Sequence, residues 1–262
     1  MTAPASNITA ILLAGARPVP DPLAVAAGVA VKPLVPVAGQ PMINHPARAL
    51  LAHPAIGRVV VLTQAPDLYA ADPATAWLAG HPKVRFEKSG GGIASSLMAF
   101  LDRGAFPFPL LMTTADHVLL DGAMLDQMVR EAAGADIAVA MVERATLLAR
   151  YPGSRRTWLK FRDGWWSGAN IFWFGSARAR PVIALWQEVE QDRKKGWKIL
   201  SAFGPLALLG AVLRISTLRG GMARVGRRFS LSARLVAMDQ AEACIDADKP
   251  DDVALIEKIL AQ

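Results

Sequence analysis

The chain has 262 residues, of which 53% are hydrophobic, and it carries one cysteine, Cys244. A single cysteine excludes an internal disulfide and a cysteine-cluster metal site, and we expect Cys244 to be a small core residue. The net charge of +7 favours acidic partners such as nucleotides, phosphorylated substrates or anionic lipids. The basic residues gather at 178–198 and 214–234 without an RNA-recognition or zinc-finger signature, so we expect no nucleic-acid partner.

Membrane insertion is not expected, because no stretch reaches the roughly 18 to 20 apolar residues that a span needs. We therefore expect a cytoplasmic protein. The basic and apolar stretch 197–234 also suits anionic headgroups, so peripheral contact with the inner face of a membrane is kept as a hypothesis. The usual explanation of such a stretch, a buried helix beside a solvated cationic face, stands next to it.

Runs with the composition of buried strands alternate with helix-like stretches through the first half of the chain. This alternation predicts βαβ units, and hence an α/β fold with a mainly parallel central sheet covered by helices. The expected strands are 8–14, 59–63, 84–87, 110–114 and 137–142, and the expected helices are 41–52, 93–101 and 122–133.

The pattern changes after about residue 144. Strands are expected at 158–161 and 168–174, joined by a turn at 162–164, and a long amphipathic helix is expected over 180–191. No glycine- or serine-rich linker marks an independent domain. We therefore predict a single domain over 1–262, elaborated at about 145–235.

The first expected strand ends in small residues, Leu13-Ala14-Gly15-Ala16, and the cations Arg17 and Lys32 follow. A small-residue turn allows backbone N–H groups to approach phosphate oxygens, and the two cations would neutralise the phosphate charge. An apolar opening strand is common in α/β proteins. The segment 32–43, which begins Lys-Pro-Leu and ends Gly-Gln-Pro-Met-Ile, strengthens the case for a triphosphate site.

These two segments resemble the MobA-like nucleotidyltransferase family, which includes molybdenum cofactor guanylyl- and cytidylyltransferases. The family pattern is Leu-Ala-Gly-Gly-x-Gly-x-Arg followed by Lys-Pro-Leu. Here Ala16 stands where the second glycine is expected, and the loop to Lys32 is longer. The resemblance covers about the first half of the chain and the last twenty or so residues.

The resemblance implies a Rossmann-like fold of the nucleotide-diphospho-sugar transferase (GT-A) type. It also implies a magnesium-dependent nucleotidylyltransferase that joins a nucleoside triphosphate, with CTP or GTP favoured, to a phosphorylated small-molecule or lipid-precursor acceptor and releases pyrophosphate. In this assignment Lys32, Arg17 and Asp116 are the candidate catalytic residues.

Asp116 is the leading candidate magnesium ligand. It directly follows the expected strand 110–114, at the sheet edge where ligands of parallel sheets bind, and it matches the family's strand-end aspartate. An aspartate in this position also often caps a turn or helix, as Asp121 could do nearby. His117 is expected to be a polar turn residue.

Asp248 is the second candidate magnesium ligand, with Asp246 in reserve. Both lie in the segment 243–255, which resembles the family's Asp-x-Asp-Thr-Pro-Glu-Asp-Leu segment. Asp248 before Lys249-Pro250 is also a helix N-cap pattern, and the two interpretations are compatible.

A glycine-rich loop at 88–92 precedes the expected helix 93–101. Glycine allows the backbone to approach a base or ribose, and a helix N-terminus offers unpaired N–H groups. A plain flexible turn would use the same residues. The expected nucleotide-binding residues are Leu13, Ala14, Gly15, Ala16, Gly90, Gly91 and Ser95.

The acceptor is expected to contact the second half of the chain. Gly168-Ala169-Asn170 resembles the Gly-x-Asn segment with which related transferases contact the acceptor, and Lys160 with Arg155 or Arg156 could pair with its phosphate. The tryptophans of this region are expected to pack rather than to bind.

Nucleotidyl transfer needs positioning and charge neutralisation more than a protein nucleophile, which agrees with the lack of a convincing serine, cysteine or histidine triad. Two alternatives remain open. One is a non-catalytic nucleotide- or lipid-binding protein with the same fold. The other is a GT-A type glycosyltransferase, against which the triphosphate-facing Lys32 argues.

Overall fold

The computed structural model describes residues 7–16, 19–104, 107–191 and 217–262. The chain divides into two compact units. The first unit comprises Met1–Gly91, Pro109–Asp126 and Ile245–Gln262, and the second comprises Gly92–Phe108 and Gln127–Cys244. Each unit is thus built from segments that are distant in sequence. The single domain stays a prediction.

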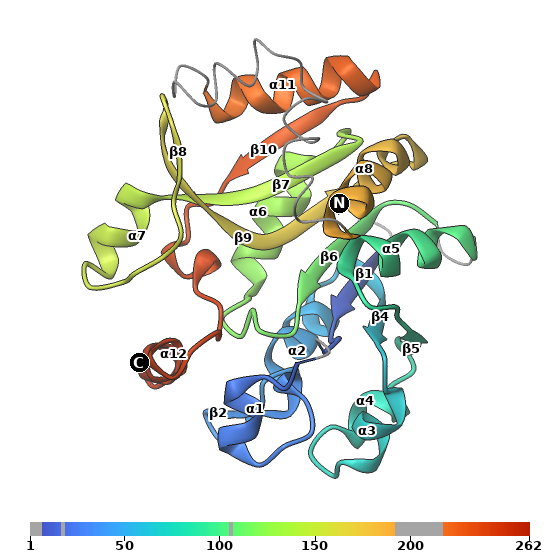
Figure 1. Ribbon diagram of the computed structural model, residues 1–262, viewed down its shortest axis with the longest axis vertical. Coiled ribbons are helices and arrows are strands. Elements are labelled where there is room, and N and C mark those ends of the chain that lie inside the picture. The colour runs from blue at the N-terminus through green and yellow to red at the C-terminus, as the bar shows by residue number, and fades with distance from the viewer. Residues whose placement is uncertain (1–6, 17–18, 105–106, 192–216) are drawn as a thin grey trace. The chain divides into compact units, whose positions relative to one another are not determined.

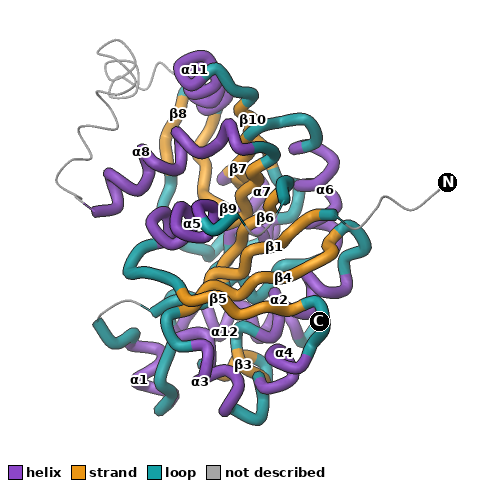
Figure 2. The backbone as a smooth tube through the Cα atoms, turned by 90° about the vertical axis from the view of Figure 1, so that its right-hand side faces the viewer, coloured by secondary structure: helices purple, strands orange, loops and turns teal. Residues whose placement is uncertain are grey.

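A parallel sheet forms the centre of the first unit, with the strand order β6-β1-β4-β5. Ala10, Ile11 and Leu12 of β1 have no exposed surface, as expected for a central strand that is covered on both faces. Helix α2 packs against β1 and β4, and Figure 2 shows β1, β4 and β5 side by side. The bounds are β1 (Ile8–Leu13), β4 (Ile56–Thr63), β5 (Val84–Lys88), β6 (Leu110–Thr114) and α2 (Asn44–Ala52).

The carboxyl ends of these parallel strands share one edge of the sheet, where ligands of α/β proteins bind. The other elements of the first unit are α1 (Pro22–Ala27), the 3-10 turn η1 (Lys32–Leu34), β2 (Pro36–Val37), β3 (Gln40–Pro41), α3 (Pro66–Ala71), α4 (Ala76–Gly80) and α12 (Pro250–Leu260) (Figure 1).

The helix expected at 41–52 begins later, at Asn44, so its predicted start is wrong. Pro41 instead belongs to β3, which pairs with β2 in a small antiparallel hairpin. The two turn residues are Ala38 and Gly39, with φ angles of 48° and 78°. Left-handed backbone at both positions is typical of a two-residue hairpin turn.

In the second unit, β10 pairs parallel with β7, and β9 pairs antiparallel with both β7 and β8. Met141, Trp166 and Leu235 form a buried cluster, against which Leu218 and Met222 of α11 pack. Helix α5 packs against α8. The bounds are α5 (Ile93–Asp102), β7 (Ile137–Glu143), α7 (Arg144–Arg150), β8 (Leu159–Phe161), β9 (Gly164–Phe174), η2 (Ala177–Ala179), α8 (Arg180–Gln191), α11 (Leu218–Phe229), β10 (Ala233–Ala237) and η4 (Ala241–Cys244), while α6 (Gly122–Ala132) contributes residues to both units.

The predicted mainly parallel, helix-covered sheet is confirmed. β6 and α8 have the predicted bounds, whereas β4 and β9 begin three and four residues earlier than expected, at Ile56 and Gly164. Cys244 is a core residue, as expected. Of the basic stretch 197–234, residues 197–216 lie outside the described residues. Within the described part of the chain, no helix is long and apolar enough to cross a membrane.

A buried tyrosine ties the end of β1 to α3. Tyr69 has no exposed surface, and its hydroxyl donates a hydrogen bond of 2.8 Å to the carbonyl oxygen of Ala14. Burial raises the pKa of Tyr69 to about 12. The folded protein therefore holds this proton more tightly than the unfolded chain, whose tyrosine pKa is about 10.

We expect Tyr69→Phe to lose about 1–3 kcal/mol of unfolding free energy at neutral pH, because the Ala14 carbonyl loses its donor. Since the folded pKa is raised, the stabilisation by Tyr69 is complete below about pH 10 and is lost as the pH rises from about 10 to 12. The difference between the two proteins should therefore shrink in that window. Urea unfolding at about pH 8 and about pH 11 measures it, and a difference that does not change with pH would contradict this role.

Candidate active site

Lys32 is the first residue of η1, and its backbone position is fixed by the buried residues that follow. Pro33 and Leu34 are buried. The carbonyl oxygen of Pro33 accepts from the N–H of Ile43 at 3.0 Å. The side chain of Lys32 can therefore move while its Cα stays in place.

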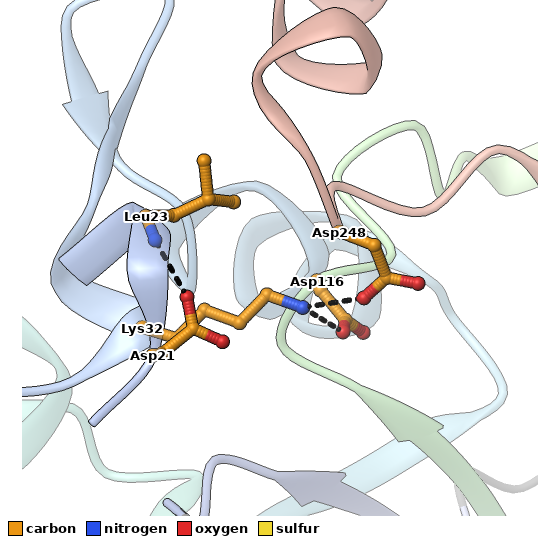
Figure 3. Close-up of polar contacts among 5 residues, drawn as sticks. All are labelled: Asp21, Leu23, Lys32, Asp116 and Asp248. Atoms are coloured by element: carbon orange, nitrogen blue, oxygen red, sulfur yellow. Dashed lines mark hydrogen bonds and ion pairs between the residues drawn. The ribbon is translucent and has the colours of Figure 1, made fainter. Parts of the chain in front are cut away.

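The ammonium group of Lys32 contacts two carboxylates (Figure 3). Its Nζ is 2.7 Å from Oδ2 of Asp116 and 2.7 Å from Oδ1 of Asp248. Asp116 follows β6 and Asp248 precedes α12, so partners that are 84 and 216 residues from Lys32 in sequence meet at one point. The neighbouring Asp21 is turned away and accepts from the N–H of Leu23, at 2.9 Å, as the cap of α1.

Electrostatics keep the Lys32–Asp116 pair charged. Burial by itself would lower the pKa of Lys32, but the charges of Asp116 and Asp248 and their hydrogen bonds raise it overall. Burial would likewise raise the pKa of Asp116, but the charge and hydrogen bond of Lys32 lower it overall. The side chains of Lys32 and Asp116 are 17% and 22% exposed, and that of Asp248 is 58% exposed, so the cluster is open to solvent on the Asp248 side.

Of the two aspartates that the sequence suggested as helix caps near the site, Asp121 is a cap and Asp248 is not. Asp121 caps α6, because its Oδ1 accepts from the N–H of Met124 at 2.8 Å. The N-cap residue of α12 is Lys249, without a side-chain capping bond, so the cap interpretation of Asp248 is wrong. The carboxylates of Asp116 and Asp248 both contact Lys32 instead.

Gln64, directly after β4, joins two loops at the same edge of the sheet. Its Oε1 accepts from the N–H of Ala16 at 2.8 Å, and its Nε2 donates to the carbonyl oxygen of Gly90 at 2.8 Å. A Cβ on Gly15 would lie 3.0 Å from the Gln64 amide. The glycine after β1 therefore makes room for Gln64, and the predicted nucleotide loops at 13–16 and 90–91 are tied together by one side chain.

We expect Gln64→Ala to speed hydrogen exchange of the Ala16 amide by up to roughly tenfold, because a typical hydrogen bond contributes about 0.5–1.5 kcal/mol. Gln64→Glu is the matched variant, since it keeps the acceptor for Ala16 but loses the donor to Gly90. It should protect Ala16 nearly as well as the wild type. Equal exchange at Ala16 in Gln64→Ala and wild type would contradict this role for Gln64.

The substitution of glycine by Ala16 has a structural explanation. In the described ranges, the non-glycine residues with positive φ are Ala38, Asn170 and Ser230. Ala16 is not among them, so its Cβ causes no left-handed strain. Of the other residues in this loop, Leu13 ends β1, Ala14 is buried, and Arg17 lies outside the described residues.

The first turn of α5, where nucleotide contacts are expected, is filled by a carboxylate of the same unit. Glu190 of α8 accepts from the backbone N–H groups of Ile93, Ala94 and Ser95 at 2.6, 3.0 and 3.3 Å. The hydroxyl of Ser95 also lies 3.4 Å from Glu190. These N–H groups, which the sequence suggested were unpaired, are therefore occupied in this structure. Gly90 and Gly91 are exposed.

The candidate acceptor residues belong to the second unit. Lys160 places its Nζ 4.2 Å from the ring centroid of Trp165, which Arg144 also approaches, at 5.0 Å. Trp165 is 39% exposed, so it departs from the expected packing role. Gly168 and Asn170 lie on β9, where Asn170 has a φ of 49° beside an irregularity in the β7–β9 register. Asparagine tolerates this left-handed backbone better than most residues.

His117 lies in the turn after β6, as expected, but is completely buried. Burial lowers its pKa to about 4, so the ring is neutral at physiological pH. The described residues contain no group of three or more histidine, cysteine, aspartate or glutamate side chains that could hold a metal ion.

Sequence reasoning missed Gln64 and Glu190. Gln64 carried a usable signal, because it follows β4 in the same way as Asp116 follows β6. Glu190 lies on an amphipathic helix nearly a hundred residues from its partners, and nothing in the local sequence distinguishes it from a solvated glutamate.

Comparison with known families gives one match over most of the chain. A family model described as the MobA-like NTP transferase domain matches residues 25–206. No match was found among curated proteins.

Among solved structures, a hypothetical transferase from Thermus thermophilus is 25% identical, with a TM-score of 0.76 over 94% of this chain and 99% of that chain. A 4-diphosphocytidyl-2C-methyl-D-erythritol synthase from Anaerococcus prevotii is 9% identical, with a TM-score of 0.61 over 97% of this chain and 96% of that one. A further 4-diphosphocytidyl-2C-methyl-D-erythritol synthase is 15% identical, with a TM-score of 0.60 over 97% of this chain and 98% of that one. The last two likenesses concern the fold alone.

Proposed function

The chain belongs to the MobA-like NTP transferase family, and we propose that it couples a nucleoside triphosphate to a phosphorylated acceptor with release of pyrophosphate. The observation that supports this most is the Lys32–Asp116–Asp248 cluster, which lies in the first unit after β6 and before α12. In this cluster, the lysine of the Lys-Pro-Leu segment contacts both aspartates that match the family pattern. A lysine cation and two carboxylates are groups suited to binding a metal-complexed triphosphate.

In the proposed reaction an oxygen of the acceptor phosphate attacks the α-phosphorus, and the bond between the α-phosphorus and the bridging oxygen to the β-phosphate breaks. Pyrophosphate leaves with the electron pair of that bond. Lys32 binds phosphate oxygens and neutralises the charge that grows on the leaving group. Arg17 is proposed as a second phosphate-binding cation.

The donor set fits magnesium. Asp116 and Asp248 each bring one carboxylate oxygen within 2.7 Å of a single cationic atom, so both oxygens reach one shared position. Magnesium prefers oxygen ligands and keeps several waters, so two carboxylates suffice. We propose Asp116 and Asp248 as its ligands, and the metal would supply charge neutralisation to the triphosphate.

The remaining assignments follow the two halves of the chain. We propose that the loops 13–16 and 90–91 contact the nucleotide, with Ser95 reached once Glu190 is displaced. Lys160, Gly168 and Asn170 are proposed to contact the acceptor. CTP and GTP are the favoured triphosphates. The acceptor is proposed to be a phosphorylated small molecule or lipid precursor. A peripheral contact of the protein with anionic membrane is part of the same proposal.

The experiment is a measurement of pyrophosphate release with magnesium and each of CTP, GTP, UTP and ATP, in the presence of a pool of phosphorylated metabolites and lipid precursors. Product masses identify the base and the acceptor. We expect release with one triphosphate. Nucleotide binding without release would favour the non-catalytic alternative, and transfer of a sugar from a nucleotide sugar would favour the glycosyltransferase.

A further inference from the structure

The Lys32 ammonium is held by two carboxylates at once. Its Nζ is equidistant, at 2.7 Å, from one oxygen of Asp116 and one oxygen of Asp248. In the proposed function these are the same carboxylates that hold a divalent cation. The lysine therefore contacts the carboxylate oxygens that are proposed to bind the cation.

The backbone segments that carry the two carboxylates are also joined by a contact that does not involve Lys32. The N–H of Ala247 donates to the carbonyl oxygen of Asp116 at 3.0 Å, which joins the loop after β6 to the loop before α12. Asp248 is one residue beyond this bond. The pair of carboxylates should therefore persist when the lysine side chain moves away.

We propose that Lys32 is an internal counter-ion that keeps the divalent-cation position closed until a triphosphate draws its ammonium away. This inference rests on the proposed function, because that function assigns the cation to Asp116 and Asp248. A divalent cation held by both carboxylates would compete with the Lys32 ammonium for the same two oxygens. Lys32 must withdraw before the carboxylates can share a metal.

The structure of η1 allows this withdrawal. Pro33 and Leu34 fix the backbone, while the four-carbon stem of Lys32 can swing from the carboxylates to a phosphate. Because one lysine charge offsets one of the two carboxylate charges, the nucleotide-free protein should bind divalent cations more weakly than the carboxylate pair alone would. Binding of the metal and of the triphosphate should then favour one another, because each requires the same movement of Lys32.

Titration of the nucleotide-free, full-length protein with Mn²⁺ tests the counter-ion role, with free Mn²⁺ followed by electron paramagnetic resonance. Wild type should bind weakly, and Lys32→Met should bind at least about tenfold more tightly, within the usual range of such couplings. Lys32→Gln should show the same gain in Mn²⁺ affinity, and it replaces Lys32→Met in the test if the methionine variant does not fold. Lys258→Met, on the exposed face of α12, is the matched control and should bind like wild type.

The double variant Lys32→Met with Asp248→Asn locates the gain, which should disappear if the metal is bound by the carboxylate pair. Equal Mn²⁺ affinity in wild type and both Lys32 variants, or a gain that survives in the double variant, would overturn the counter-ion role. If the wild type releases pyrophosphate but the Lys32 variants bind Mn²⁺ no more tightly than it does, the counter-ion role is rejected and the proposed function stands. If the Lys32 variants bind Mn²⁺ more tightly but the wild type never releases pyrophosphate, the proposed function is rejected and the counter-ion role stands.

Discussion

Lys32→Ala is expected to reduce pyrophosphate release by about 100- to 1,000-fold, the usual effect of removing one group that stabilises developing charge. The reason is that Lys32 is the cation that contacts both Asp116 and Asp248 in the described part of the chain. The variant should remain folded, because Lys32 is partly exposed and η1 is held by its buried neighbours. Steady-state kinetics with the triphosphate and acceptor that support turnover measure the loss.

Lys258→Ala is the matched control for Lys32→Ala, since it removes the same charge from an exposed position on α12. It should leave turnover unchanged. Circular dichroism of both variants checks the fold. Turnover by a folded Lys32→Ala protein at the wild-type rate would remove Lys32 from the reaction.

Asp116→Asn is expected to cause a loss of similar size, about 100- to 1,000-fold in pyrophosphate release. Asparagine has nearly the same shape but no charge, so the change removes the attraction for Lys32 and the proposed metal ligand while the packing after β6 is kept. The loss should appear in turnover and in the magnesium concentration needed for half-maximal rate.

Asp121→Asn is the control for this change, because Asp121 caps α6 in the same turn region and asparagine is also a good N-cap. Its turnover should stay within about twofold of wild type. If Asp121→Asn lost as much activity as Asp116→Asn, the effect would reflect the loop after β6 and not the Asp116 carboxylate.

The strands of the first unit were predictable because each is a short apolar run that a parallel sheet buries on both faces. Asp116 followed from the same rule, since residues after such strands gather at one edge. The meeting of Lys32 with Asp248 could not be derived in this way. The two are 216 residues apart, and only the resemblance to known transferases connected their segments.

Other features depend on contacts that local sequence does not encode. The late start of α2 results from a hairpin whose turn uses Ala38, a residue with no particular preference for left-handed backbone. α11 lies in the stretch 197–234, for which a buried helix beside a solvated cationic face was one expectation; the structure supplies its partners, because Leu218 and Met222 pack against Met141, Trp166 and Leu235. Tertiary packing decides these elements.

Lys32, Asp116 and Asp248 are proposed to bind a magnesium-bound triphosphate, and calorimetric titration tests this proposal most directly. Each of CTP, GTP, UTP and ATP is titrated, with and without magnesium, into wild type and into Asp116→Asn. We predict that wild type binds at least one of the four when magnesium is present, and that Asp116→Asn binds it at least about tenfold more weakly because a carboxylate ligand for the metal is lost. A wild type that binds none of them, or an Asp116→Asn protein that binds equally well, would contradict this assignment.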